Sequence, residues 1–226
     1  MDSGHLNVFD GRQWTARSLA AEGVPGDCGN LLQTWDGTVW LSARYVVAAW
    51  RGGRWQRYEK PAVPIPNVAN FIGEGIDGAL WIGGSGTEIQ RVDYATGRWR
   101  TLLDLMFQWE GPDGTEWFLH RDGRVVTHRD GQWTSYGEAD GVPEAPVALI
   151  GTRSGEVWVA GSHRGEAAMA RHRAGQGWER IVQSEFAWGV DWRGVLEAAD
   201  GSVWFAATVD SRAGSVPKVQ QKDGLW

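Results

Sequence analysis

The chain has 226 residues and a formal net charge of −6 without any run of basic residues, which excludes an extended phosphate-binding surface, so nucleic acid is not predicted as a partner. Its longest apolar run, residues 45–50, is too short to cross a bilayer, and the first residues lack the basic-then-apolar pattern of a secretory signal, so neither membrane insertion nor a signal is predicted. With a single cysteine, Cys28, the chain cannot form an internal disulfide framework. The unusual feature of the composition is its 16 tryptophans, accompanied by 32 glycines.

An Asp-Gly-x-x-Trp pattern recurs along the chain and sets a period. It occupies residues 36–40, 77–81, 113–117 and 200–204, and residues 154–158 carry it with serine in place of aspartate. The starts lie 41, 36, 41 and 46 residues apart, a spacing typical of the blades of a β-propeller. We therefore expect the repeated tryptophans to fill the space between adjacent blades.

Each repeat is predicted to hold four short antiparallel strands, named a to d from the hub outwards. In the first complete repeat these are residues 30–35, 38–42, 45–50 and 54–58. The Asp-Gly and Gly-Gly steps between them are typical of tight hairpins that need positive φ. A second pattern, Gly-x-Trp, marks the turn from strand c to strand d. No segment of comparable length has a helical period.

The two ends of the chain leave the blade number open. Residues 5–10 and 13–19 are predicted as strands c and d, and the last repeat reaches strand c at residues 217–223. The amino-terminal strand could complete the last blade, which would give about five blades without an open sheet edge. Alternatively, the chain is a fragment of a propeller of six or seven blades.

The predicted fold class is thus all-β, a β-propeller of four-stranded blades. We predict a single domain over residues 1–226, with repeats near residues 1–28, 29–60, 61–103, 104–144, 145–185 and 186–226.

The repeats resemble those of the two-component regulator propeller family. The likeness rests on residues 7–15, 23–25 and 36–41, and it returns at residues 131–136, 140–143 and 155–161, with valine for the usual leucine. The resemblance implies the input module of a bacterial signalling protein, a periplasmic location, a small-molecule or peptide ligand, and a signalling output domain or partner protein.

A second resemblance concerns residues 111–118, which are similar to repeats of the streptogramin lyase propellers. Those enzymes open a cyclic peptide ester with a histidine, acidic residues and magnesium. A matching histidine and glutamate pair cannot be aligned on one loop of this chain.

Strand order predicts which loops share a face of the propeller. The a-to-b and c-to-d turns lie on one face and are short and regular, whereas the b-to-c and d-to-a connections lie on the other face and vary. Variable loops on a rigid scaffold are where recognition is usually placed. The candidate ligand-binding residues are therefore those of the variable-loop face: Arg44, Tyr45, His120, Arg121, His163, Arg164, Trp188, Asp191, Trp192 and Arg212.

Patterns of catalysis are sparse in this sequence. The five histidines have no metal-ligand spacing, and there is no nucleophile elbow or phosphate-binding loop. No catalytic residue, metal site or cofactor is predicted; His172 and Trp109 are interpreted as packing residues. The first hypothesis is a non-catalytic recognition or sensor propeller. The alternatives are a lyase or hydrolase with His120 or His163 as general base beside a carboxylate, and a structural platform for protein interactions.

Overall fold

The computed structural model describes residues 4–24, 28–66, 69–84, 87–184, 189–208 and 224–225. The chain divides into two compact units, Met1–Leu105 and Met106–Trp226. Within the described ranges, no helix is long and apolar enough to span a membrane.

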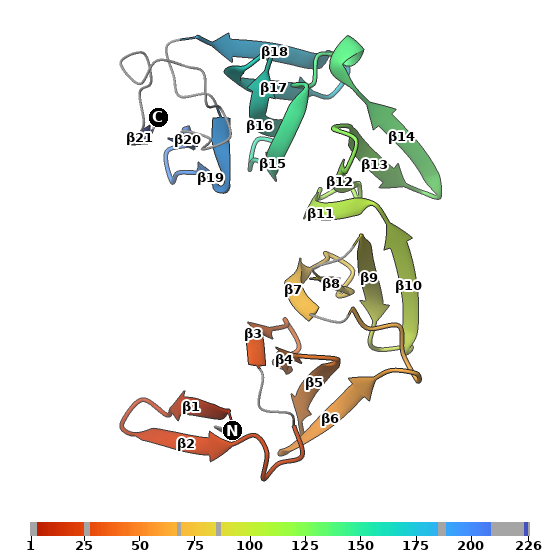
Figure 1. Cartoon of the computed structure of the whole chain (residues 1–226), viewed down its shortest axis with the longest axis vertical. Helices are drawn as coiled ribbons and strands as arrows, with labels where there is room; N and C mark the ends of the chain where they lie inside the picture. Colours follow the sequence, from red (N-terminus) through yellow and green to blue (C-terminus); the bar gives the residue numbers. More distant parts are fainter. Residues whose placement is uncertain are drawn as a thin grey trace. The chain divides into compact units, whose positions relative to one another are not determined.

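The first unit contains a hairpin followed by two four-stranded antiparallel sheets (Figure 1). The strands are β1 His5–Phe9 and β2 Trp14–Ser18; β3 Cys28–Gln33, β4 Val39–Ala43, β5 Val46–Arg51 and β6 Arg54–Glu59; and β7 Ala69–Glu74, β8 Leu80–Gly84, β9 Glu88–Asp93 and β10 Arg98–Leu103. In both four-stranded sheets the strands lie side by side in chain order, which is the arrangement of a propeller blade.

The second unit repeats this plan with two four-stranded sheets and one three-stranded sheet. The elements are β11 Leu105–Glu110, β12 Glu116–His120, β13 Val125–Arg129 and β14 Gln132–Tyr136; the short 3₁₀ helix η1 Glu138–Asp140; β15 Ala145–Gly151, β16 Val157–His163, β17 Glu166–Arg173 and β18 Gly177–Gln183; and β19 Gly189–Glu197, β20 Val203–Thr208 and β21 Gly224–Leu225.

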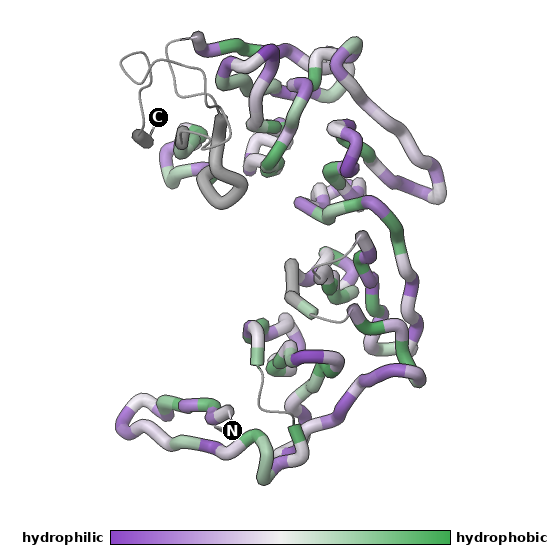
Figure 2. The backbone as a smooth tube through the Cα atoms, in the orientation of Figure 1, coloured by the Kyte–Doolittle hydropathy of each residue, from purple (hydrophilic) through white to green (hydrophobic). Residues whose placement is uncertain are grey.

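Burial follows the position of a strand within its sheet. Nearly all side chains of the inner strands β4 and β5 are buried, because neighbouring sheets cover both of their faces. The outermost strands alternate between exposed and half-buried residues, as in β6 and β10, and β6 and β14 are mostly hydrophilic in Figure 2. The core therefore lies between the sheets.

The repeated tryptophans are central to the packing between sheets. Trp40 is fully buried and packs with Leu80 and Ile82 of the following sheet and with Ile65 of the connection between β6 and β7. Trp117 packs in the same way against Val157. Truncation of a buried tryptophan to alanine lowers the free energy of unfolding by about 3–5 kcal/mol, so each of these side chains contributes strongly to stability.

The Asp-Gly turns have the local chemistry that the sequence predicts. Gly37 and Gly114 have φ of 81° and 78°, a conformation that glycine adopts without steric cost. The preceding aspartate accepts a hydrogen bond from the backbone N–H two residues further on, at 3.0 Å for Asp36 and 3.1 Å for Asp113. Each hairpin is thus stabilised by its own aspartate, independently of the rest of the fold.

The predicted fold class is confirmed: the chain is all-β, with the four-stranded sheets of a propeller. One detail differs from expectation. Trp204 is 39% exposed, because no later sheet covers β20 within the part of the chain that the structure describes. Residues 224–225, which follow the strand c expected at residues 217–223, form the third strand β21. Residues 217–223 lie outside the described ranges. Closure of the ring and the single domain stay predictions, since both concern how the two units are related.

Candidate functional site

Part of the predicted variable-loop face is brought together in the second unit. His163 and Arg164 lie on the turn from β16 to β17, and the backbone N–H of Arg164 donates to Glu144 Oε2 at 3.1 Å. Glu144 belongs to the connection between η1 and β15. A Cβ atom at Gly123 would lie 2.7 Å from the Glu144 carbonyl oxygen, so the turn from β12 to β13, which carries His120, also lies against this connection.

His163 is buried and engaged in this cluster. Arg180 Nη1 lies 2.8 Å from His163 Nε2, and because a guanidinium only donates, the imidazole nitrogen is the acceptor. Arg180 also donates to the backbone carbonyls of Glu138 and Gly141. The lone pair that a general base would need is therefore occupied in the described structure.

The remaining predicted residues are placed as follows. The Arg44 guanidinium lies 5.4 Å from the ring of Tyr45, which is exposed and has φ of 65°. His120 Nδ1 lies 2.6 Å from Asp122 Oδ1, and Arg121 is exposed. Trp188, Arg212 and the side chains of Asp191 and Trp192 lie outside the described residues. A role of this face in ligand binding stays a prediction.

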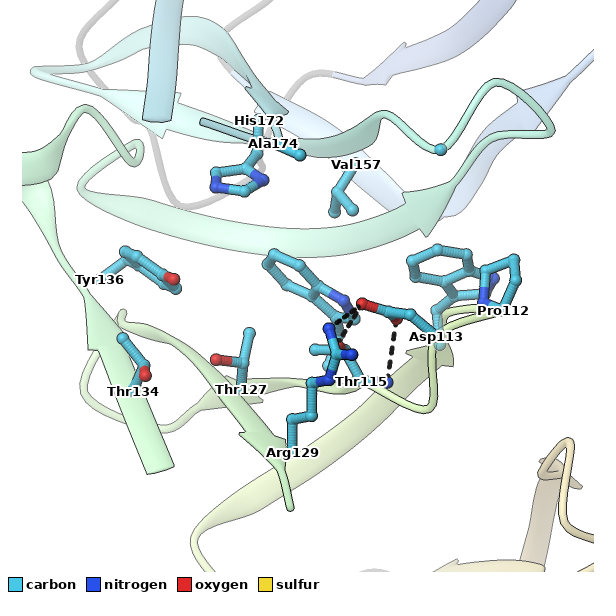
Figure 3. A pocket seen from close by; sticks show the side chains of 13 residues that line it. Pro112, Asp113, Thr115, Thr127, Arg129, Thr134, Tyr136, Val157, His172 and Ala174 are labelled. Atoms are coloured by element: carbon cyan, nitrogen blue, oxygen red, sulfur yellow. Dashed lines mark hydrogen bonds and ion pairs between the residues drawn. The ribbon is translucent and has the colours of Figure 1, made fainter. Parts of the chain in front are cut away.

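A pocket of about 460 Å³ lies between the sheet of β11–β14 and the sheet of β15–β18, at the end of the strands that carries the Asp-Gly turns (Figure 3). Four aromatic side chains contribute to its lining, and Thr115, Thr127 and Thr134 add hydroxyl groups. The aromatic residues are Trp109, Trp117, Tyr136 and His172. Figure 3 shows that the lining comes from both sheets, with His172 and Val157 opposite Thr127 and Arg129.

An ion pair lies on one side of the pocket. Arg129 Nη1 lies 2.6 Å from Asp113 Oδ2, and both side chains are about half exposed, at 52% and 51%. Desolvation raises the pKa of Asp113, but two hydrogen bonds from Thr115 and the charge of Arg129 outweigh it, so its pKa is lowered. Asp130 Oδ2 lies 3.5 Å from Arg129 Nε as well, so the guanidinium faces two carboxylates.

His172 lies at the aromatic side of the pocket. Its ring centroid is 5.0 Å from that of Trp178, 5.5 Å from that of Trp117 and 5.9 Å from that of Tyr136. Burial lowers the pKa of the His172 imidazole. The side chain is therefore neutral at neutral pH, with a ring that behaves as part of the aromatic wall.

The corresponding groove in the first unit, between β3–β6 and β7–β10, is filled by Tyr94. Its ring lies 5.3 Å from that of Trp40 and 4.9 Å from the Arg51 guanidinium, and its hydroxyl donates to Glu74 Oε1 at 2.9 Å. Glu74 Oε2 also accepts the backbone N–H of Trp35, at 2.7 Å.

Strand register identifies the equivalent positions in the two grooves. Val92 pairs with Leu80, and His172 pairs with Val157, so the residues two positions later, Tyr94 and Ala174, correspond. Glu74 also pairs with Leu80, and Gly151 pairs with Val157, so Glu74 corresponds to Gly151.

The pocket therefore exists where the second unit departs from the pattern of the first. Ala174 stands in place of the tyrosine, and Gly151 stands in place of the glutamate. The Trp109 indole covers Gly151 so closely that a Cβ there would lie 2.1 Å from Trp109 Cε2. In the first unit Glu74 accepts the backbone N–H of Trp35. The residue at the position of Trp35 in the second unit is Pro112, which has no N–H, so the absence of a carboxylate at Gly151 leaves no backbone donor unpaired.

Sequence reasoning missed this pocket because it treated the Asp-Gly turn face as regular hairpin chemistry. Trp109 was expected to be a packing residue, and it does pack, but it also forms a wall of the pocket. The available signal was the coincidence of Gly151, Pro112 and Ala174, each of which departs from its counterpart in another repeat.

No protein-family model and no curated protein sequence matches this chain. Among solved structures, it is similar to the virginiamycin B lyase of Staphylococcus aureus, with 16% identity and a TM-score of 0.59 over 90% of this chain and 70% of that one. It is also similar to the extracellular domains of two hybrid two-component systems of B. thetaiotaomicron. The first has 18% identity and a TM-score of 0.57, over 80% of this chain and 25% of that one. The second has 13% identity and a TM-score of 0.58, over 90% of this chain and 29% of that one.

The present chain thus spans between a quarter and a third of those two extracellular domains. Identities at this level establish a shared fold, the β-propeller, and nothing finer. Among the residues that the structure describes, no group of three or more His, Cys, Asp or Glu side chains converges in a way that could hold a metal ion.

Proposed function

We propose that this chain is a recognition module of the sensor-propeller kind, which binds a small organic ligand without transforming it, in the pocket between β11–β14 and β15–β18. The observation that carries the proposal is the pocket itself, which combines aromatic walls, hydroxyl groups and an ion pair in a space that a side chain fills in the neighbouring unit. Concave sites with mostly apolar walls and a few oriented polar groups are typical of ligand binding.

The fold shared with extracellular domains of two-component systems supports a sensory role, in which the chain would act as the input module of a signalling protein. A periplasmic location and coupling to an output domain follow from the same proposal. Non-catalytic binding is favoured because His163, one of the two histidines considered as general bases, accepts a hydrogen bond from Arg180, and because neither His120 nor His163 lines the pocket.

The test is a ligand screen on the purified chain with a blocking variant and a matched control. Ala174→Tyr places in the pocket the side chain that fills the neighbouring groove, whereas Arg164→Ala changes the variable-loop face and leaves the pocket intact. A library of small organic molecules is screened by saturation-transfer NMR against the unmodified chain and both variants.

We expect compounds that bind the unmodified chain and Arg164→Ala equally, and that bind Ala174→Tyr at least tenfold more weakly. Compounds lost in Arg164→Ala and retained in Ala174→Tyr would move the site to the variable-loop face and contradict the proposal. Mass spectrometry after prolonged incubation checks the second part, because conversion of a bound compound would contradict non-catalytic binding.

A further inference from the structure

We infer that the pocket receives a single aromatic ring of its ligand, held at the position that Tyr94 occupies in the neighbouring groove. This inference rests on the proposed function, since it names the class of ligand for the same pocket. Its basis is the internal repeat, which offers one filled and one open version of the same arrangement.

The filled version defines how a ring is held. Tyr94 lies with its ring tilted by 56° against Trp40, and the Arg51 guanidinium stands 4.9 Å from the ring centroid. A planar guanidinium over an aromatic face is attracted by the negative charge density of that face. The groove thus combines an aromatic contact on one side with a cation on the other.

The open version keeps the same partners. Trp117 corresponds to Trp40, and Arg129 corresponds to Arg51, because each arginine is the last paired residue of strand c in its sheet. Both of these residues line the pocket. The Arg129 side chain is 52% exposed, compared with 37% for Arg51, as expected when the ring that covers the guanidinium is replaced by the methyl group of Ala174.

The end of the pocket at Gly151 differs from the corresponding end of the filled groove, and this difference indicates which substituent the ring of the ligand carries. In the first unit Glu74 accepts the hydroxyl of Tyr94, but the equivalent position is Gly151, which the Trp109 indole covers. An indole face offers no acceptor comparable to a carboxylate, and burying a hydroxyl without a partner is costly. A benzyl-type ring is therefore expected to bind better than a phenol with its hydroxyl directed to that end.

Two carboxylates compensate the charge of Arg129, since Asp113 and Asp130 both lie against its guanidinium. The site therefore has no net positive charge that would favour an anionic ligand over a neutral ring. Discrimination then depends on whether the ring is aromatic, since a saturated ring of the same size fills the space but has no quadrupole.

The experiment compares benzyl alcohol with cyclohexylmethanol, which are both neutral and of similar size, in NMR titrations that follow the tryptophan indole resonances. We expect benzyl alcohol to bind about two- to fivefold more tightly, the range for a cation–π contact at a partly exposed site. Arg129→Gln should reduce the ratio of the two affinities, because only the contact with the aromatic wall then distinguishes the probes, and Ala174→Tyr should abolish both.

Tyr94→Ala provides a second, independent reading, because it opens the template groove. Circular dichroism first verifies that the variant is folded. We expect a second benzyl alcohol site, with perturbation of the Trp40 indole resonance.

Equal affinities for the two probes in the unmodified chain would overturn the inference and leave the pocket as a binding site. An aromatic preference that Arg129→Gln does not reduce at all would overturn the assigned position of the ring beside Arg129. If the screen finds ligands that Ala174→Tyr excludes and none of them contains an aromatic ring, the inference falls and the proposed function stands. If Ala174→Tyr affects no ligand at all, the proposed function itself fails.

Discussion

Replacement of Gly151 by alanine tests the contact that shapes the wall of the pocket. Gly151 ends strand β15, and its backbone conformation is one that an ordinary residue can adopt. A Cβ atom there would meet Trp109 Cε2 at 2.1 Å, Cζ2 at 2.2 Å and Cδ2 at 2.3 Å. Since ordinary contact begins near 3.4 Å, the indole must move by more than about 1 Å.

The expected cost is that of overpacking, about 1–3 kcal/mol of the free energy of unfolding. For a chain of this size, each kcal/mol corresponds to a fall in Tm of about 2–4 °C. The measurement is urea unfolding followed by circular dichroism, which reports the strands independently of the indole that moves.

Gly73→Ala is the matched control. Gly73 lies in the equivalent first strand of another sheet, β7, and a Cβ atom there would have no neighbour within 4 Å. That variant is expected to leave stability unchanged or to raise it by up to about 1 kcal/mol, because alanine restricts the unfolded chain.

A double-mutant cycle decides whether the indole is the cause. In a Trp109→Ala background, Gly151→Ala should lose most of its cost, because the atoms that it meets are gone. If Gly151→Ala is as destabilising in that background as in the unmodified chain, or if it behaves like Gly73→Ala, the assignment of this contact is wrong.

Three further predictions follow from individual contacts. Glu74→Ala should destabilise the first unit by about 1–3 kcal/mol, since it removes the two hydrogen bonds that Glu74 accepts, from the backbone N–H of Trp35 and from the hydroxyl of Tyr94; a change within about 0.3 kcal/mol in urea unfolding would contradict this. Because burial lowers the folded-state pKa of His172, the contribution of its neutral ring to the free energy of unfolding should be fully present above about pH 6.5 and should be lost as the pH falls below that value. His172→Phe should flatten this part of a plot of Tm against pH, and an unchanged slope in that variant would contradict the prediction. Arg180→Lys should speed hydrogen exchange near Gly141 as strongly as Arg180→Ala does, because an ammonium cannot reproduce the several directed bonds of the guanidinium; full protection in the lysine variant would disprove that role.

The sequence alone was sufficient to identify the blades. The Asp-Gly-x-x-Trp period gives the fold class, and the strands expected at residues 30–35 and 54–58 agree with β3 and β6 to within two residues at each end. These features are local. A hairpin depends on a glycine with positive φ and on an aspartate that accepts its own backbone N–H, both encoded within a few residues.

The candidate site was less accessible from the sequence. Contact between the η1–β15 connection and the β16–β17 turn follows from strand order, and the bond from Arg164 to Glu144 agrees with it. The engagement of His163 by Arg180 could not be derived, because it depends on a side chain from a third strand, β18.

The pocket was decided by tertiary structure alone. Whether Ala174 leaves a gap depends on which side chains of the preceding sheet face it, and these come from residues about 40 positions earlier in the chain. The backbone conformation of Gly151 does not require glycine, so the sequence gives no local reason for it. The reason is the Trp109 indole, which leaves no space for a side chain at this position. Turns and strand pairing are determined by neighbours in sequence, whereas the space between two sheets is determined by the sum of side-chain volumes that meet there, which no single repeat contains.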